Sequence, residues 1–251
     1  MRRFAASWAF LVAAALAGPG APAGASAAPR VVSATQTVRV TPRDDGGVRG
    51  RQVASYTALG LRSRDWDLRA SLSWLHWRDD GGALALPGDS GFGSAYLSAG
   101  RRIWTTRADG ASATAWLRLK GKIPLQTDFG VTGSGAFDWG GSLFTTFRLG
   151  RATLLTEIGR LHLGGPSGYG EDGMTSVSSF LSYARPGARL YPLAGYGRAS
   201  SLAPGEPPYG EWSLGLGSVV SPDVSLTALY AASTTGGGQH GSVAVSVWLR
   251  L

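Results

Sequence analysis

Cysteine is absent from this chain of 251 residues. Lysine is nearly absent, because only two of the 24 basic residues are lysines, namely Lys120 and Lys122. Without cysteine there is no disulfide framework, thiolate nucleophile or cysteine-ligated metal site. Only 16% of the residues are charged, while 43% are hydrophobic, and this composition excludes a disordered chain. The 38 glycines follow no three-residue period, which excludes collagen. The composition therefore favours a folded chain with many turns.

The basic character of the chain does not indicate a nucleic-acid partner. The formal net charge is +8, but the arginines are spread along the chain and mixed with acids, whereas a phosphate-binding surface clusters its basic residues. A glycine-rich stretch at 130–141 is not followed by a helical pattern, so it is no dinucleotide-binding loop. We expect no nucleic-acid partner and no cofactor.

The first residues have the pattern of an export signal. Arg2 and Arg3 precede an apolar run at 4–17, and small residues at 25–27 provide a cleavage site. A short membrane helix is the alternative, but the run is too short to span a bilayer. The expected division is a cleaved signal peptide at 1–27 and one domain at 28–251.

The remaining chain alternates apolar and polar residues with a period of two. Val243, Val245 and Leu249, for example, alternate with Ser242 and Ser246. No later stretch approaches 18 consecutive apolar residues, so we expect no transmembrane helix after the signal. The alternation predicts an all-β fold with about twelve strands. The expected strands are 31–40, 50–62, 66–78, 91–104, 111–123, 134–149, 151–163, 174–185, 188–199, 210–220, 223–234 and 241–251.

The expected connections alternate strictly between short and long. The short turns are 63–65, 107–110, 150–151, 186–187 and 221–223, and the longer connections are 41–49, 79–90, 124–133, 164–173, 200–209 and 235–240. Transmembrane barrels have short periplasmic turns and longer external loops, whereas a soluble sandwich has no reason to sort its loops in this way. We therefore predict an antiparallel transmembrane β-barrel of about twelve strands, with ten strands as the alternative, in the outer membrane of a Gram-negative cell.

Aromatic residues support the barrel over the alternative of a secreted β-sandwich. In each strand, the alternate positions that carry the apolar residues (the apolar parity) should face lipid, and the other positions (the polar parity) should face the interior. Aromatic residues on the apolar parity should collect at the two membrane interfaces. Four of them are near the long connections, namely Trp74, Trp139, Trp212 and Tyr230. Three are near the short turns, namely Trp66, Phe147 and Tyr183. One group near each end of the strands is the arrangement expected of two aromatic girdles, one at each membrane interface.

The middle of the chain resembles a known group of outer-membrane barrels. The segment 121–124 is followed by 133–135 and Asp138, then by a hairpin at Gly150 and by 157–159. This pattern of about 40 residues is similar to the phenol meta-pathway degradation family, whose members are often described as transporters. The resemblance implies a barrel of twelve or nearly twelve strands and the passage of small compounds, with aromatic compounds as candidates.

The resemblance has two departures. Leu125 and Gln126 replace the family's usual Thr-Gly. The final alternating strand resembles the signal read by the barrel-assembly machinery, although that signal usually ends in an aromatic residue and this chain ends in Leu251. We expect the assembly machinery to be a partner through this strand, and outer-membrane lipid and lipopolysaccharide to surround the barrel.

Charged residues on the polar parity are expected to line the interior of the barrel. They are Arg62, Asp67, Arg69, Arg102, Arg118, Lys120, Asp138, Arg148, Glu157, Glu211 and Arg250. Their basic excess predicts a water-filled channel for passive diffusion of small solutes, with aromatic or anionic compounds as candidates. The alternative is that these residues form salt bridges and close the interior, which would leave a structural or adhesive barrel.

An enzyme is the third hypothesis. His240 and Ser242 are two residues apart on one strand, as in lipid hydrolases that activate a serine with a histidine. No residue nearby can orient the base, and Ser242 is on the inward parity, so we expect no enzyme and no catalytic residue. Acidic pairs at 79–80 and 171–172 could hold calcium, but solvated loop charge explains them, and we expect no metal site.

Overall fold

The computed structural model describes residues 31–45, 48–79, 89–125, 136–164, 173–185, 187–201, 208–235 and 238–251. Twelve strands make up nearly all of this described part. They are β1 (Val31–Asp45), β2 (Val48–Arg62), β3 (Trp66–Asp79), β4 (Asp89–Ala108), β5 (Ala111–Pro124), β6 (Asp138–Leu149), β7 (Ala152–His162), β8 (Met174–Tyr183), β9 (Leu190–Ala199), β10 (Tyr209–Ser221), β11 (Val224–Thr235) and β12 (Gly238–Arg250). The predicted signal peptide at 1–27 lies outside the described residues and stays a prediction.

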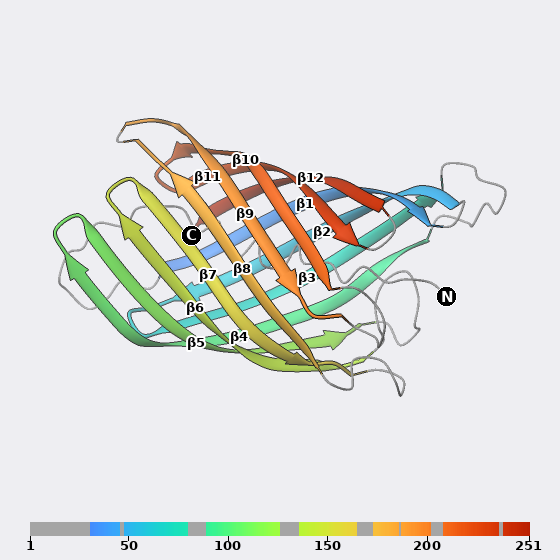
Figure 1. Cartoon of the computed structure of the whole chain (residues 1–251), viewed down its shortest axis with the longest axis horizontal. Helices are drawn as coiled ribbons and strands as arrows, with labels where there is room; N and C mark the ends of the chain where they lie inside the picture. Colours follow the sequence, from blue (N-terminus) through green and yellow to red (C-terminus); the bar gives the residue numbers. More distant parts are fainter. Residues whose placement is uncertain are drawn as a thin grey trace.

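The strands form one closed antiparallel barrel, as predicted. Each strand pairs with its neighbours in the chain, and β1 pairs with β12 through contacts such as Val38 with Val245, which closes the sheet. The short turns lie at one end of the barrel, together with the C-terminus, and the strand ends that the longer connections join lie at the other (Figure 1). Because the sheet has no edge, its backbone N–H and C=O groups are paired within the sheet, which is what a barrel in lipid requires. The described residues contain no helix long and apolar enough to cross a membrane.

Two of the connections predicted to be long are shorter than expected. The segment 41–49 was predicted as a loop, but Thr41 pairs with Gln52 and Asp45 pairs with Val48, so β1 and β2 continue as one ladder almost to their turn. Strands β11 and β12 continue in the same way, to the pair of Thr235 with Gly238. The prediction ended each strand where the alternation of apolar and polar residues ends. The backbone hydrogen bonds between the strands continue for several residues beyond that point. The β1–β2 hairpin consequently projects past the neighbouring strands (Figure 1, blue).

Proline and glycine occupy positions that suit their backbone properties. Pro192 pairs with Leu216 of β10, while the β8–β9 ladder ends one residue away at Leu193, so the strand tolerates a residue without an N–H. In two short turns, Gly110 and Gly150 have φ values of +71° and +53°, which side chains rarely adopt. These residues therefore allow the tight hairpins at the short-turn end.

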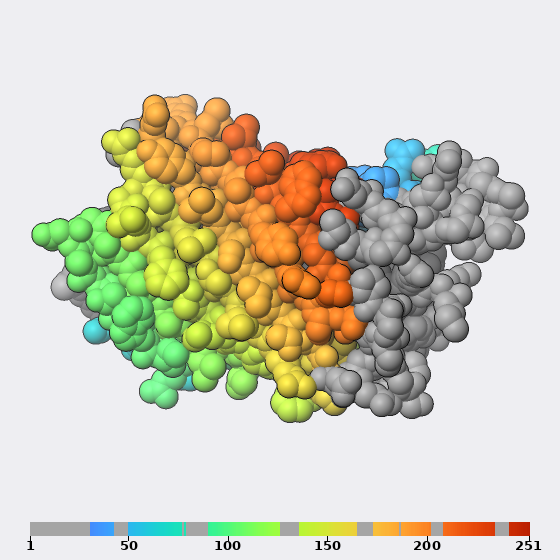
Figure 2. All heavy atoms as spheres, in the orientation of Figure 1, coloured from blue at the N-terminus to red at the C-terminus, as the bar shows by residue number. Residues whose placement is uncertain are grey.

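The two faces of the sheet differ as the alternation predicts. On β12, Val243 and Val245 are exposed on the outer face, while Ser242 and Ser246 are buried on the inner face. Figure 2 shows outward side chains covering the wall that is turned to the viewer. All seven aromatics predicted for the girdles are exposed, with 39% to 56% of their surface accessible: Trp66, Trp74, Trp139, Phe147, Tyr183, Trp212 and Tyr230.

Candidate functional site

Asp67 is the centre of a charged cluster on the inner wall. Its carboxylate accepts hydrogen bonds from three guanidinium groups, at 2.6 Å from Arg118 Nη2, 3.2 Å from Arg69 Nε and 3.3 Å from Arg62 Nη2. Asp67 and Arg118 are each only 3% exposed, while Arg62 is 39% exposed. One negative charge is therefore surrounded by three positive charges, of which the outermost is the most accessible.

Sheet register explains how Arg118 of β5 reaches Asp67 of β3. Both residues are paired with Gly100 of the intervening strand β4. A Cβ atom on Gly100 would lie 2.9 Å from Cγ of Arg118, so the missing side chain makes room for the arginine to cross β4. The glycine is therefore part of the site, although it carries no functional group.

Glu157 extends this cluster across the next strands. Its Oε1 atom lies 2.6 Å from Nζ of Lys120, accepts a 2.5 Å hydrogen bond from Oγ of Ser142 and lies 3.9 Å from Nη1 of Arg118. The Arg118 guanidinium also lies 3.8 Å from the ring centroid of Phe144, in cation–π geometry. We call the group formed by Arg62, Asp67, Arg69, Arg118, Lys120 and Glu157 the Asp67–Glu157 cluster.

A second inward group crosses the closure of the barrel, where β1 pairs with β12. Arg39 of β1 donates from Nη2 to Glu211 of β10 at 2.6 Å and from Nε to Oγ of Ser242 at 2.9 Å. The hydroxyl of Tyr209 donates to the same Glu211 carboxylate at 2.9 Å. Because Ser242 is only 2% exposed and accepts from an arginine, this group is a buried polar network.

Apolar side chains cover another part of the inner wall. Phe180 of β8, Tyr191 and Leu193 of β9 and Leu229 of β11 form a buried cluster. Phe180 and Leu193 are each three residues from the short-turn end of their strands, and the Asp67–Glu157 cluster includes the residues at the short-turn ends of β2 and β3. The half of the barrel nearer the short turns therefore has one charged wall and one apolar wall.

The structure brings most of the predicted lining residues into ion pairs. Seven of the eleven belong to the two networks, and Asp138 pairs with Nζ of Lys122 at 2.5 Å. The other three lie toward the short-turn end: Arg102 pairs with Asp65 of the turn at 2.7 Å, while Arg148 and Arg250 are exposed. Sequence reasoning missed Arg39. The signal was present, because Thr37 and Arg39 alternate with Val38, which places Arg39 on the polar, inward parity.

The proposed catalytic pair is only partly described. The backbone of His240 pairs with Ser233, but its side chain lies outside the described part, as do the acidic side chains at 79–80 and 171–172. Ser242 faces inward and is held by Arg39, away from the outer face on which lipid would lie. Among the described side chains, no three acidic or histidine residues are grouped as metal ligands.

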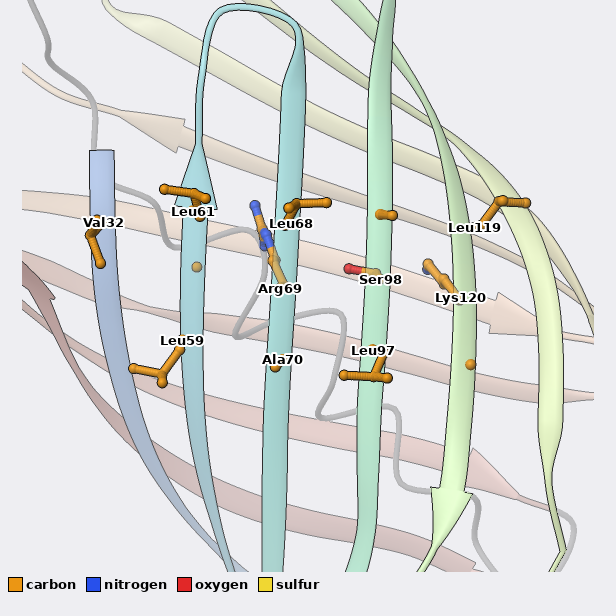
Figure 3. Close-up of a pocket in the computed structure, with 13 residues that line it drawn as sticks. Val32, Leu59, Leu61, Leu68, Arg69, Ala70, Leu97, Ser98, Leu119 and Lys120 are labelled. Carbon is orange, nitrogen blue, oxygen red and sulfur yellow. The ribbon is translucent and has the colours of Figure 1, made fainter. Parts of the chain in front are cut away.

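A shallow apolar groove of about 580 Å³ lies on the outer wall over β1 to β5. Figure 3 shows leucines around it, including Leu59, Leu68 and Leu97, with Ala70 among them. Leu59 and Leu97 are 56% and 50% exposed. Most of its lining is apolar, which suits contact with hydrocarbon, and its two charged lining residues, Arg69 and Lys120, belong to the Asp67–Glu157 cluster.

Comparisons with solved structures support the fold. The COG4313 outer membrane channel from Pseudomonas putida F1 is similar with a TM-score of 0.62 and 12% identity, over 93% of this chain and 99% of that one. The NanC porin gives a TM-score of 0.55 and 9% identity, over 88% and 100%. The outer membrane phospholipase A from Escherichia coli gives 0.51 and 12%, over 86% and 92%. The sequence matches no family model and no curated protein.

The class of protein defined by the fold is the twelve-stranded outer-membrane β-barrel. At these identities, the likeness concerns the fold alone, and it includes both channels and an enzyme. The resemblance to the phenol meta-pathway degradation family rests on the residues in the middle of the chain and stays a prediction. The choice between a channel and an enzyme therefore depends on the chemistry of the interior.

Proposed function

We propose that this barrel lies in the outer membrane of a Gram-negative cell and allows passive diffusion of small anionic solutes. The observation that carries the proposal is the charge imbalance around Asp67, where one carboxylate faces Arg62, Arg69 and Arg118. Charged rings inside a pore set its selectivity, and an excess of guanidinium groups favours anions. Arg62 is the arginine of this group that is most accessible to a passing solute.

The inward charges of the described residues are positive in sum. Six basic side chains on the inner wall take part in ion pairs, namely Arg39, Arg62, Arg69, Arg118, Lys120 and Lys122, and four acidic ones do so, namely Asp67, Asp138, Glu157 and Glu211. These paired residues therefore carry an excess of two positive charges, six against four.

The apolar cluster favours anions that carry an aromatic body. Phe180, Tyr191, Leu193 and Leu229 form the apolar part of the inner wall in the same half of the barrel as the arginines, with 4% to 8% of each residue exposed. An aromatic carboxylate presents one charged end and one apolar end, so it complements both walls at once. Benzoate is the simplest probe of this chemistry.

Solute efflux from proteoliposomes tests the proposal. Benzoate should leave vesicles containing the refolded barrel several times faster than benzylamine, a cation of nearly the same size. Replacing both Arg62 and Arg69 with glutamine should abolish the difference, because it removes two of the three positive charges around Asp67.

The matched control is Arg101→Gln. Arg101 lies over the ring of Trp66 on the outer face, with 5.9 Å between its Cζ atom and the ring centroid, so its loss should leave the ratio of the two rates unchanged. Rates equal to those of protein-free vesicles would contradict the proposal and favour a closed structural or adhesive barrel.

A further inference from the structure

Two exposed arginines lie close together at the end of the barrel that holds the short turns. Arg151 is in the turn between β6 and β7, and Arg185 comes two residues after Tyr183, the last residue of β8. The backbone N–H of Ala184 donates to the carbonyl of Arg151 at 3.0 Å, and β7 pairs with β8 along its length, so the two turns are neighbours (Figure 1). We call these two residues the Arg151–Arg185 pair.

Both guanidinium groups of the pair interact with the hydroxyl of Tyr183. This tyrosine is 42% exposed on the outer face, in the aromatic girdle near the short turns. A guanidinium has five N–H donors, so one hydroxyl occupies only a small part of the capacity of the two arginines. Two positive charges that converge on one uncharged oxygen repel each other. An anion bound between them would offset this repulsion.

The connections that carry this pair contain no acidic residue. They span 150–151 and 184–189, and the second contains a further arginine, Arg189. Asp109 is in the β4–β5 turn, whose backbone accepts a hydrogen bond of 2.7 Å from the β6–β7 turn. Among the described residues, however, the ion pairs include neither this aspartate nor the two arginines. The segment 1–30, which precedes β1, also contains no acid. The charge of the pair is therefore left for an external anion.

Apolar side chains on the outer face adjoin the pair. Leu149, at the end of β6, is 73% exposed, Leu181 of β8 is 47% exposed and Leu190, at the start of β9, is 62% exposed. Aromatic girdles mark the level at which lipid headgroups meet hydrocarbon, and short turns face the periplasm in such barrels. A ligand with both a phosphate and acyl chains complements the arginines and the leucines together, which an acidic soluble protein does not. The surroundings of the pair thus favour a lipid of the periplasmic leaflet.

We propose that Arg151 and Arg185, with the Tyr183 hydroxyl that both contact, bind the phosphodiester of an anionic phospholipid in the periplasmic leaflet. Guanidinium groups bind phosphate oxygens through paired hydrogen bonds. Two of them together favour a headgroup that has no cation of its own, because such a cation would be repelled by the pair. The proposal rests on the outer-membrane location given under Proposed function, but not on channel activity.

Native mass spectrometry of the refolded barrel in detergent micelles tests this site. The probes are dioleoyl phosphatidylglycerol, which is anionic, and dioleoyl phosphatidylcholine, in which a cationic choline follows the same phosphodiester. The wild-type barrel should retain the anionic lipid preferentially. Arg151→Gln with Arg185→Gln should lower the affinity for this lipid about 30-fold, because each arginine near an anionic headgroup contributes a roughly fivefold preference.

The matched control is Arg148→Gln with Arg250→Gln. Both arginines are exposed near the same end of the barrel, but they continue the inward parity of Phe144 and Ser246, which are buried. This variant loses the same number of charges without a change on the outer face, so it should bind the anionic lipid as the wild type does. A heat-dependent shift in gel mobility shows that each variant is folded.

Three results would overturn the proposal. The first is equal retention of the two lipids by the wild type. The second is an affinity that is unchanged in the outward variant, or lowered equally in both double variants, because net charge and not a site would then attract the lipid. The third is displacement of the lipid by millimolar inorganic phosphate, because the site would then recognise the free ion. These measurements are independent of solute transport, so failure here is distinct from failure of the channel proposal.

Discussion

Arg118 is the residue through which the inward charges are connected. It touches Asp67 at 2.6 Å, approaches Glu157 at 3.9 Å and lies over the ring of Phe144. With 3% of its surface exposed, it has little water to replace any of these partners. When a buried ion loses its partner, no attraction offsets the free energy of removing that ion from water.

Replacing Arg118 with methionine should therefore destabilise the barrel. The free energy of unfolding should fall by about 3 to 5 kcal/mol, because Asp67 loses its closest buried partner. Urea titration of the barrel folded into lipid vesicles measures this. The control is Arg102→Met, whose partner Asp65 is 59% exposed, and which should cost less than about 1 kcal/mol. Equal losses in the two variants would show that burial of the pair is unimportant.

Glycines on β9 and β10 leave room for the aromatic rings that the neighbouring strands direct inward. A Cβ atom on Gly217 would lie 2.2 Å from Cζ of Tyr191, and one on Gly195 would lie 2.5 Å from the ring of Phe180. Gly197 differs, since its nearest neighbour would be Cβ of Ser178 at 3.8 Å. The apolar wall thus depends on Gly195 and Gly217, and on Gly215, where a Cβ atom would lie 2.6 Å from Cδ2 of Leu229, but not on Gly197.

Gly217→Ala should displace the Tyr191 ring, at a cost of about 1 to 3 kcal/mol from overpacking. Gly197→Ala makes only ordinary contact and should change the free energy of unfolding by less than about 0.5 kcal/mol. The two variants are compared by the same urea titration. A neutral Gly217→Ala would mean that Tyr191 is free to move away from the apolar wall.

The alternation of each strand also makes a prediction about lipid contact. Val245 of β12 is 50% exposed on the outer face and Ser246 is 4% exposed on the inner face. Because the chain has no cysteine, one cysteine at either position can be labelled alone with a fluorophore. Brominated lipids should quench the label at position 245 several times more than the label at position 246. Equal quenching would contradict the assignment of the two faces.

Sequence patterns predicted the strands well because each strand has one apolar face and one polar face. They predicted the ends less well, since β1 continues to Asp45 through a ladder that includes Pro42. Within the candidate site, parity identified Asp67, Arg118 and Glu157. It did not predict that Arg118 would cross β4, because that contact depends on the register of three strands and on Gly100.

At the scale of the whole molecule, the barrel has walls of different chemistry. One inner wall holds arginines around Asp67, another holds Phe180 and Tyr191, and the outer face carries apolar residues between two aromatic girdles. Twelve strands give a barrel between the filled eight-stranded kind and the open sixteen-stranded porins. Strand number alone leaves conduction undecided, so the charges of the interior provide the test.

The reversal potential of single channels in a planar bilayer under a potassium chloride gradient tests the central claim most directly. The refolded barrel should conduct, and its reversal potential should have the sign of chloride preference. The Arg62→Gln and Arg69→Gln double variant should shift that potential toward the potassium side. Absence of conductance from folded, heat-modifiable protein, or a potassium preference in the wild type, would contradict the account of an open, positively charged interior.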